Sequence, residues 1–136
     1  MFKRIDHVEI IPTDFERAIE FYVSVLGFTV KERFPVAAAP LKEIAFLALG
    51  DTVLELISVK QPAAAPRGQW QAGYRAMAIE VEDMDSAIKY LAGKGIAITW
   101  GPADTGRSIR AEIQDPDGLP IELRQWRTPA CGTQPS

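Results

Sequence analysis

One plan of strand and helix occurs twice along this chain, and that duplication limits the possible folds more than any other feature. The first copy begins with a strand-like run at His7 and the second begins with a similar run at Ala76, 69 residues later. Near the end of each copy a lone glutamate lies in an apolar strand-like run, Glu55 in the first and Glu122 in the second, at a spacing of 67 residues. One small loop difference accounts for the drift of two residues. A βαβββ unit has a sheet face that it cannot bury alone, so the repeat predicts two such units in tandem.

Each copy contains one helix-like pattern with recognisable ends. In the first copy Thr13 and Glu16 have the spacing of a capping box, apolar residues follow at helical spacing, and Gly27 ends the pattern. In the second copy Asp83 is the candidate N-cap and Gly95 follows the last apolar position. Both copies therefore predict a short amphipathic helix after the first strand.

The remaining strand-like runs and turns complete two modules. The turn Gly50-Asp51 joins two runs into a hairpin, and Asp115-Pro116-Asp117-Gly118 precedes the last run. We predict an α+β fold of two tandem βαβββ modules, about residues 4–60 and 73–127, which form an open, incompletely closed mixed β-barrel with the helices outside. They make a single domain, residues 1–128, followed by a disordered tail, 129–136. The predicted strands are 5–11, 43–49, 52–59, 76–81, 96–100, 109–114 and 119–125, with a surface loop at 33–40 and a linker at 61–68.

Composition excludes several classes of partner. The 15 basic and 18 acidic side chains give a net charge of -3 without long blocks of either sign, which argues against binding to nucleic acid or to an anionic membrane. No apolar run is long enough to span a bilayer. Cys131 is the sole cysteine, so no internal disulfide forms and the chain fits a reducing compartment. We therefore expect a cytoplasmic protein whose partner is a small molecule or a second copy of the chain.

The alternation of side chains along the strands predicts one polar sheet face. A carboxylate buried without a partner is costly, so Glu55 and Glu122 inside apolar strands indicate a shared cation or a polar cavity. Since alternate side chains of a strand share a face, the apolar residues belong under the helices. The opposite face then collects the polar side chains in a concavity where a ligand binds: His7, Glu9, Glu55, Glu80, Glu122 and Arg124.

The repeat and three motifs resemble the vicinal oxygen chelate superfamily. The motifs are Ile5-Asp6-His7-Val8, the segment 21–28 with the sequence FYVSVLGF, and the segment 115–123 with the sequence DPDGLPIEL. The resemblance covers about residues 4–126. The superfamily includes glyoxalase I, methylmalonyl-CoA epimerase, extradiol dioxygenases, fosfomycin-resistance transferases and bleomycin-binding proteins, so the resemblance is specific for the fold and less so for the reaction.

The resemblance also implies a set of metal ligands. In metal-dependent members the ligands come from the first and fourth strands of each module, positions that fall here on His7, Glu55, Ala76 and Glu122. Three of these side chains can bind a divalent ion such as Ni, Co, Mn, Mg or Zn, and open coordination positions remain for two substrate oxygens. Ala76 cannot bind an ion, which counts against a ring-cleaving dioxygenase because a triad with two histidines cannot be built from one. It also leaves open that no ion is bound.

Two functions of different class follow from this resemblance. The first is a divalent-metal-dependent isomerase or lyase of glyoxalase I or epimerase type that acts on a small oxygenated substrate through an enolate-like intermediate. In this enzyme Glu55 or Glu122 moves the proton after detaching from the ion, and Glu9 is a reserve candidate for that role. The second is a metal-free binding protein of bleomycin-resistance type, which Ala76 favours. For Glu122 the alternative to metal binding is a salt bridge to Arg110 or Arg124, and for Glu55 it is pairing with a nearby arginine. The predicted substrate-binding residues are Glu9, Arg107, Arg110 and Arg124.

We also expect a homodimer, because open sheets have edges that need covering and because members of the superfamily commonly pair.

Overall fold

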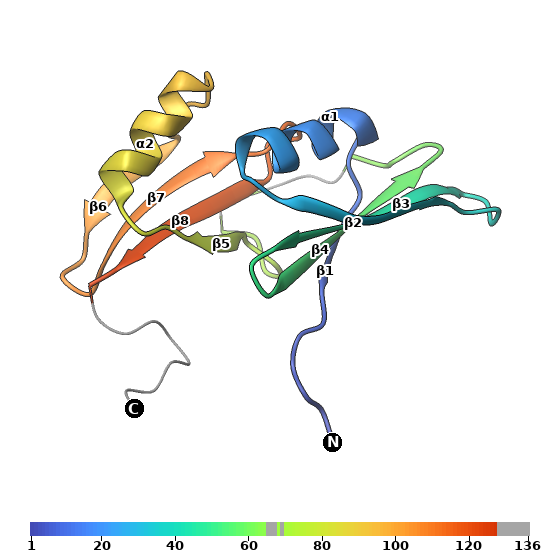
Figure 1. Cartoon of the computed structure of the whole chain (residues 1–136), viewed down its shortest axis with the longest axis horizontal. Helices are drawn as coiled ribbons and strands as arrows, with labels where there is room; N and C mark the ends of the chain where they lie inside the picture. Colours follow the sequence, from blue (N-terminus) through green and yellow to red (C-terminus); the bar gives the residue numbers. More distant parts are fainter. Residues whose placement is uncertain (65–67, 69, 128–136) are drawn as a thin grey trace. The chain divides into compact units, whose positions relative to one another are not determined.

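The computed structural model describes residues 1–64, 68 and 70–127. These residues fold into two units, Met1–Pro66 and Arg67–Ser136, which we call the first and the second module (Figure 1). The predicted tail at 129–136, which contains Cys131, lies outside the described residues, as does part of the predicted linker at 61–68.

The first module is a four-stranded mixed sheet with one helical segment. The strand order is β1-β4-β3-β2, with β1 parallel to β4 and the other neighbours antiparallel. An α-helix continues directly into one turn of π-helix, and Gly27 follows with a φ of 82°. The elements are β1 (Val8–Ile10), α1 (Phe15–Glu20), η1 (Phe21–Val25), β2 (Thr29–Pro35), β3 (Leu41–Leu49) and β4 (Thr52–Val59).

The second module repeats this topology. Its sheet has the order β5-β8-β7-β6, with β5 parallel to β8 and the remaining pairs antiparallel. The predicted α+β fold of two βαβββ modules is therefore confirmed as two open four-stranded mixed sheets with one helical segment each. The elements are β5 (Met77–Glu80), α2 (Met84–Gly93), β6 (Trp100–Asp104), β7 (Ser108–Gln114) and β8 (Pro120–Trp126).

Each module buries one face of its sheet under its helix, as Figure 1 shows for α1 over β4 and α2 over β8. The inward side chains of β4 and β8 are almost completely buried, as the alternation predicts. Val8 is the exception among the residues predicted for this face, because it is 48% exposed at the sheet edge. The core residues that the two copies share by position are Leu54 and Leu56 in β4 and Ile121 and Leu123 in β8.

The first module differs from its prediction in several places. No strand was predicted between residues 11 and 43, whereas β2 spans Thr29–Pro35. The first strand is shorter than expected and begins at Val8, so His7 precedes it. Asp14 and not Thr13 is the N-cap of α1, with its carboxylate accepting a hydrogen bond from the Arg17 backbone N–H. The predicted loop at 33–40 begins in fact as the end of β2, because the Arg33 side chain is held there by ion pairs to Glu16 and Glu43.

The second module departs from prediction around Trp100. The segment 96–99 was expected to be a strand, but pairing with β7 begins only at Trp100. The register then shifts between Trp100 and Ala103, where Gly101 has a φ of 80°. Bulges of this kind carry no clear signal in the alternation of apolar residues.

Among the described residues, no helix is both long enough and apolar enough to cross a bilayer.

Candidate functional site

Three predicted site residues converge in the first module. The Nε2 atom of His7 lies 3.1 Å from Oε2 of Glu55 and 3.5 Å from Oε2 of Glu9. One ligand-type atom from each of the three residues falls within 4.8 Å of the other two. One imidazole nitrogen and two carboxylate oxygens at such distances form a donor set that suits a divalent transition metal.

The parallel pairing of β1 with β4 explains this convergence. Glu9 and Glu55 are register partners, so their side chains leave the sheet on the same face, and His7 precedes Glu9 by two residues. Glu55 is only 8% exposed, whereas the Glu9 side chain is largely exposed. The ring of Phe46, the partner of Glu55 on β3, makes an edge-to-face contact with the imidazole. The cluster is therefore half-buried, with Glu9 on its solvent side.

Asp6 completes the cluster, and sequence reasoning missed it. Its Oδ2 atom lies 2.8 Å from Nδ1 of His7, on the opposite side of the ring from Glu55. This hydrogen bond raises the pKa of His7, and the charge of Glu55 adds to the effect. A carboxylate on the second ring nitrogen is the common way in which proteins orient a metal-binding histidine. The only signal in the sequence is that Asp6 directly precedes His7.

Glu122 occupies a different environment in the second module. Oε1 accepts a hydrogen bond from Nε of Arg110 at 2.8 Å, and Oε2 accepts one from Nε of Arg124 at 2.9 Å. Burial raises the pKa of this carboxyl, but the hydrogen bond from Arg124 and the charges of both arginines outweigh burial and hold the pKa below its ordinary value. Both salt bridges considered as the alternative to metal binding are thus present. Glu55 has no such pairing with an arginine among the described residues.

The second module lacks the donors that form the cluster of the first. Ala78 is the register partner of Glu122, as Glu9 is of Glu55, and Ala76 precedes it by two residues as His7 precedes Glu9. Where the first module offers an imidazole and a carboxylate, the second therefore carries two methyl groups. Within the described residues, the only group of histidine or acidic side chains close enough to hold one ion is that of His7, Glu9 and Glu55.

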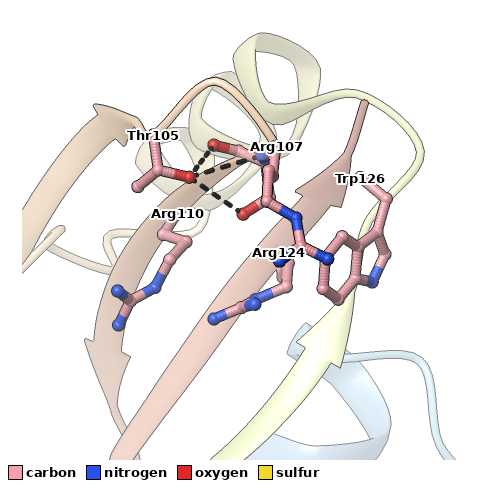
Figure 2. A pocket seen from close by; sticks show the side chains of 6 residues that line it. Thr105, Arg107, Arg110, Arg124 and Trp126 are labelled. Atoms are coloured by element: carbon pink, nitrogen blue, oxygen red, sulfur yellow. Dashed lines mark hydrogen bonds between the residues drawn. The ribbon is translucent and has the colours of Figure 1, made fainter. Parts of the chain in front are cut away.

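The predicted substrate-binding arginines lie together at a pocket of the second module (Figure 2). Its volume is about 380 Å³. Arg110 comes from β7, Arg124 comes from β8, and Arg107 lies in the turn before β7. The hydroxyl-bearing lining residues were not foreseen. Among the described residues, those that line the pocket are Thr105, Arg107, Ser108, Arg110, Arg124 and Trp126.

Glu80, predicted for the polar face, lies at the exposed end of β5 and is the register partner of Arg124. It forms no ion pair with any described residue, and it is not among the lining residues of the pocket.

The sequence matches known proteins over most of its length. Residues 4–123 match the model of the Glyoxalase/Bleomycin resistance protein/Dioxygenase superfamily. The protein YaeR of Escherichia coli is 31% identical over 89% of this chain and 95% of its own length. A lactoylglutathione lyase of Neisseria meningitidis is 30% identical over 92% of each chain. A mitochondrial methylmalonyl-CoA epimerase of Bos taurus is 30% identical over 90% of this chain and 74% of its own length.

The fold agrees with a solved structure of similar sequence. The crystal structure of a glyoxalase family protein from Enterococcus faecalis superposes with a TM-score of 0.78 and 31% identity, covering 90% of this chain and 98% of that one.

Proposed function

Because the chain belongs to the Glyoxalase/Bleomycin resistance protein/Dioxygenase superfamily, we propose that it is a divalent-metal-dependent isomerase or lyase that acts on a small oxygenated substrate. The observation that carries this proposal is the meeting of His7 Nε2 with Glu55 and Glu9, with Asp6 behind the ring. Relatives that are a lactoylglutathione lyase and a methylmalonyl-CoA epimerase support the reaction class.

The donor set fits a divalent ion. His7 and Glu55 would hold it, and Glu9 offers a third ligand from the same module. Glu122 remains a predicted ligand from the second module, but both of its oxygens already accept hydrogen bonds from Arg110 and Arg124, which would compete with a metal. A bound divalent ion would supply Lewis-acid stabilisation of negative charge on adjacent substrate oxygens.

The remaining chemistry is a proton transfer by a carboxylate. A general base works best when its pKa lies near the operating pH. Glu122 is held ionised with a lowered pKa and is thus a weak base while its ion pairs last. Of the two predicted proton acceptors, Glu55 is therefore favoured, provided that it detaches from the ion during the reaction. Glu9 is a further candidate because it lies beside Glu55 and is open to solvent.

Titration calorimetry with Ni, Mn and Zn on untagged protein tests the proposal. We expect wild-type binding to be lost in His7→Ala and Glu55→Gln, with activity lost alongside it and the fold retained. Glu32→Gln, an exposed glutamate of β2, is the matched control and should bind as wild type does. If Glu9→Gln weakens binding about tenfold while Glu122→Gln does not, the ion is held within the first module alone.

The metal-free binding protein is the second candidate, and a specific observation favours it. Ala76 and Ala78 stand where the first module has His7 and Glu9, so one ligand of the family pattern is missing. Ala76→His should restore that ligand and tighten ion binding by about tenfold or more. If wild type binds no ion and Ala76→His does, the chain is a binding protein and the enzyme proposal fails.

A further inference from the structure

The pocket of the second module carries more positive charge than the nearby carboxylates neutralise. Arg107, Arg110 and Arg124 contribute three positive charges to its lining, and Glu122 returns one negative charge. No described acidic side chain pairs with Arg107, and Arg124 forms an ion pair with Glu122 but not with its register partner Glu80. The lining as folded therefore carries two uncompensated positive charges.

The backbone register makes this charge arrangement costly without a ligand. Arg110 and Arg124 are direct register partners on β7 and β8, so their side chains leave the same face of the sheet side by side. Like charges directly opposite one another in a sheet are destabilising. Glu122 relieves part of the repulsion because its two oxygens accept hydrogen bonds from both guanidinium groups. An anion in the pocket would relieve the remainder.

Both guanidinium groups are also held in place before any ligand arrives. The Arg110 guanidinium lies 5.3 Å from the Trp100 ring centre, and the Arg124 guanidinium lies 4.8 Å from the Trp126 ring centre. Each arginine is thus fixed by a tryptophan and by Glu122. Their Nε and Nη2 atoms donate to Glu122, which leaves Nη1 of each arginine for another acceptor. Such preorganisation lowers the entropic cost of binding an anion.

We propose that this pocket binds the phosphate group of a small substrate. A phosphate monoester carries about -1.5 to -2 charges near neutral pH and three acceptor oxygens, which matches two excess positive charges and several guanidinium donors. A single carboxylate would leave one positive charge unmatched. The hydroxyls of Thr105 and Ser108 add short polar groups to the lining. The inference rests on the proposed function only in assigning the anion to the substrate, because phosphate binding itself needs no metal.

Calorimetry with inorganic phosphate, phenyl phosphate and acetate on the full chain in chelator at low salt tests the proposal. We expect both phosphates to bind, each at least tenfold more tightly than acetate. Arg107→Gln, an exposed position that pairs with no described acidic residue, should weaken phosphate binding about tenfold. Arg127→Gln is the matched control, since it removes the same charge from the same module outside the pocket, where Arg127 pairs with Asp104.

Three results would overturn the proposal. These are no binding of inorganic phosphate by wild type, equal weakening by Arg107→Gln and Arg127→Gln, and acetate binding as tight as phosphate binding. Binding of inorganic phosphate without phenyl phosphate would overturn its assignment to a substrate ester. His7→Ala separates this proposal from the metal proposal, because it should lose metal binding and keep phosphate binding. If the wild-type protein binds metal but no phosphate, the phosphate proposal fails and the metal proposal stands.

Discussion

Asp6 forms a hydrogen bond with the only histidine in the chain, His7. Its hydrogen bond raises the pKa of His7, with a further contribution from the charge of Glu55. We expect Asp6→Asn to lower that pKa toward 6.5, the ordinary value for histidine. NMR titration of metal-free protein measures it directly, because one histidine gives one set of ring signals. Asp51→Asn, in an exposed turn, is the control, and an unchanged His7 titration in Asp6→Asn would show that Asp6 is not the cause.

The direction of this shift also fixes its effect on stability. A folded-state pKa above the unfolded value means that protonated His7 stabilises the fold at pH values below about 6.5. That contribution is lost as the pH rises through the folded-state pKa. Metal binding has the opposite pH dependence, because a ligand nitrogen must be free of its proton.

Among the described glycines, Gly101 is the one where an added Cβ atom would come closest to the backbone of another strand. A Cβ atom at this position would lie 2.7 Å from the carbonyl oxygen of Arg110, and the φ of 80° disfavours any other residue. We expect Gly101→Ala to lower the free energy of unfolding by about 1–3 kcal/mol in thermal or denaturant melts. Gly93→Ala is the control, because open space surrounds that last residue of α2 and alanine favours helix by about 0.5–1 kcal/mol. Equal melts for the two variants would contradict the steric argument.

At the scale of the elements, the N-terminus of α2 is capped in part by a side chain of the strand β8. The Met84 backbone N–H donates to the side-chain oxygen of Gln125 on β8 at 2.6 Å, and the Ser86 N–H donates to Asp83. The sheet thus satisfies one free N–H of the helix that covers it. We expect Gln125→Ala to cost about 1 kcal/mol of unfolding free energy, measured by denaturant melts. Gln114→Ala, an exposed position on β7, should cost little, and equal effects would refute the capping role.

The elements that sequence could predict are those with periodic apolar residues. The boundaries of β4 and the N-cap Asp83 follow from alternation and capping chemistry alone. The strand β2 could not be found this way, and its end was taken for the start of a loop. Its side chains are mostly exposed, and Arg33 is fixed there by Glu16 and Glu43, contacts that depend on the tertiary fold. The register shift at Gly101 was missed for a related reason, because its cause is the approach of β7.

The part of the candidate site that depends on the alternation of side chains along a strand could be predicted from the sequence. The part in which several side chains can bind the same partner could not. The pairing of Glu9 with Glu55 follows from the alternation in two parallel strands. The choice of Glu122 between a metal and the arginines does not, because ion pairing depends on how Arg110 and Arg124 are held by neighbouring rings. Neither tryptophan contact has a spacing that could be recognised in the sequence.

At the scale of the whole molecule, the first module leaves large apolar side chains exposed beside its edge strand. β1 ends the strand order β1-β4-β3-β2, and the exposed fractions are 95% for Phe2, 81% for Ile5 and 54% for Ile11. An open sheet edge bordered by apolar groups is a site for pairing between chains. We therefore predict a homodimer through this edge, detectable by light scattering at micromolar concentration.

Substitution can test that edge. Ile5→Asp should shift the dimer toward monomer, because it places a charge among apolar groups that the interface would bury. Tyr90→Asp places the same charge on an exposed aromatic position of α2 and should leave the mass unchanged. A wild-type monomer would rule out the prediction, as would a dimer that Ile5→Asp leaves intact.

The stacking of arginine on tryptophan in the second module means that intrinsic tryptophan fluorescence can report on the pocket. The chain has three tryptophans, and two of them, Trp100 and Trp126, lie against the guanidinium groups of Arg110 and Arg124. A cation beside an indole ring alters its emission, so any ligand that draws these arginines away should change the intrinsic fluorescence. Trp70, which is 81% exposed and has no such neighbour among the described residues, supplies a constant background. Libraries of unlabelled compounds can therefore be screened against this pocket by fluorescence alone.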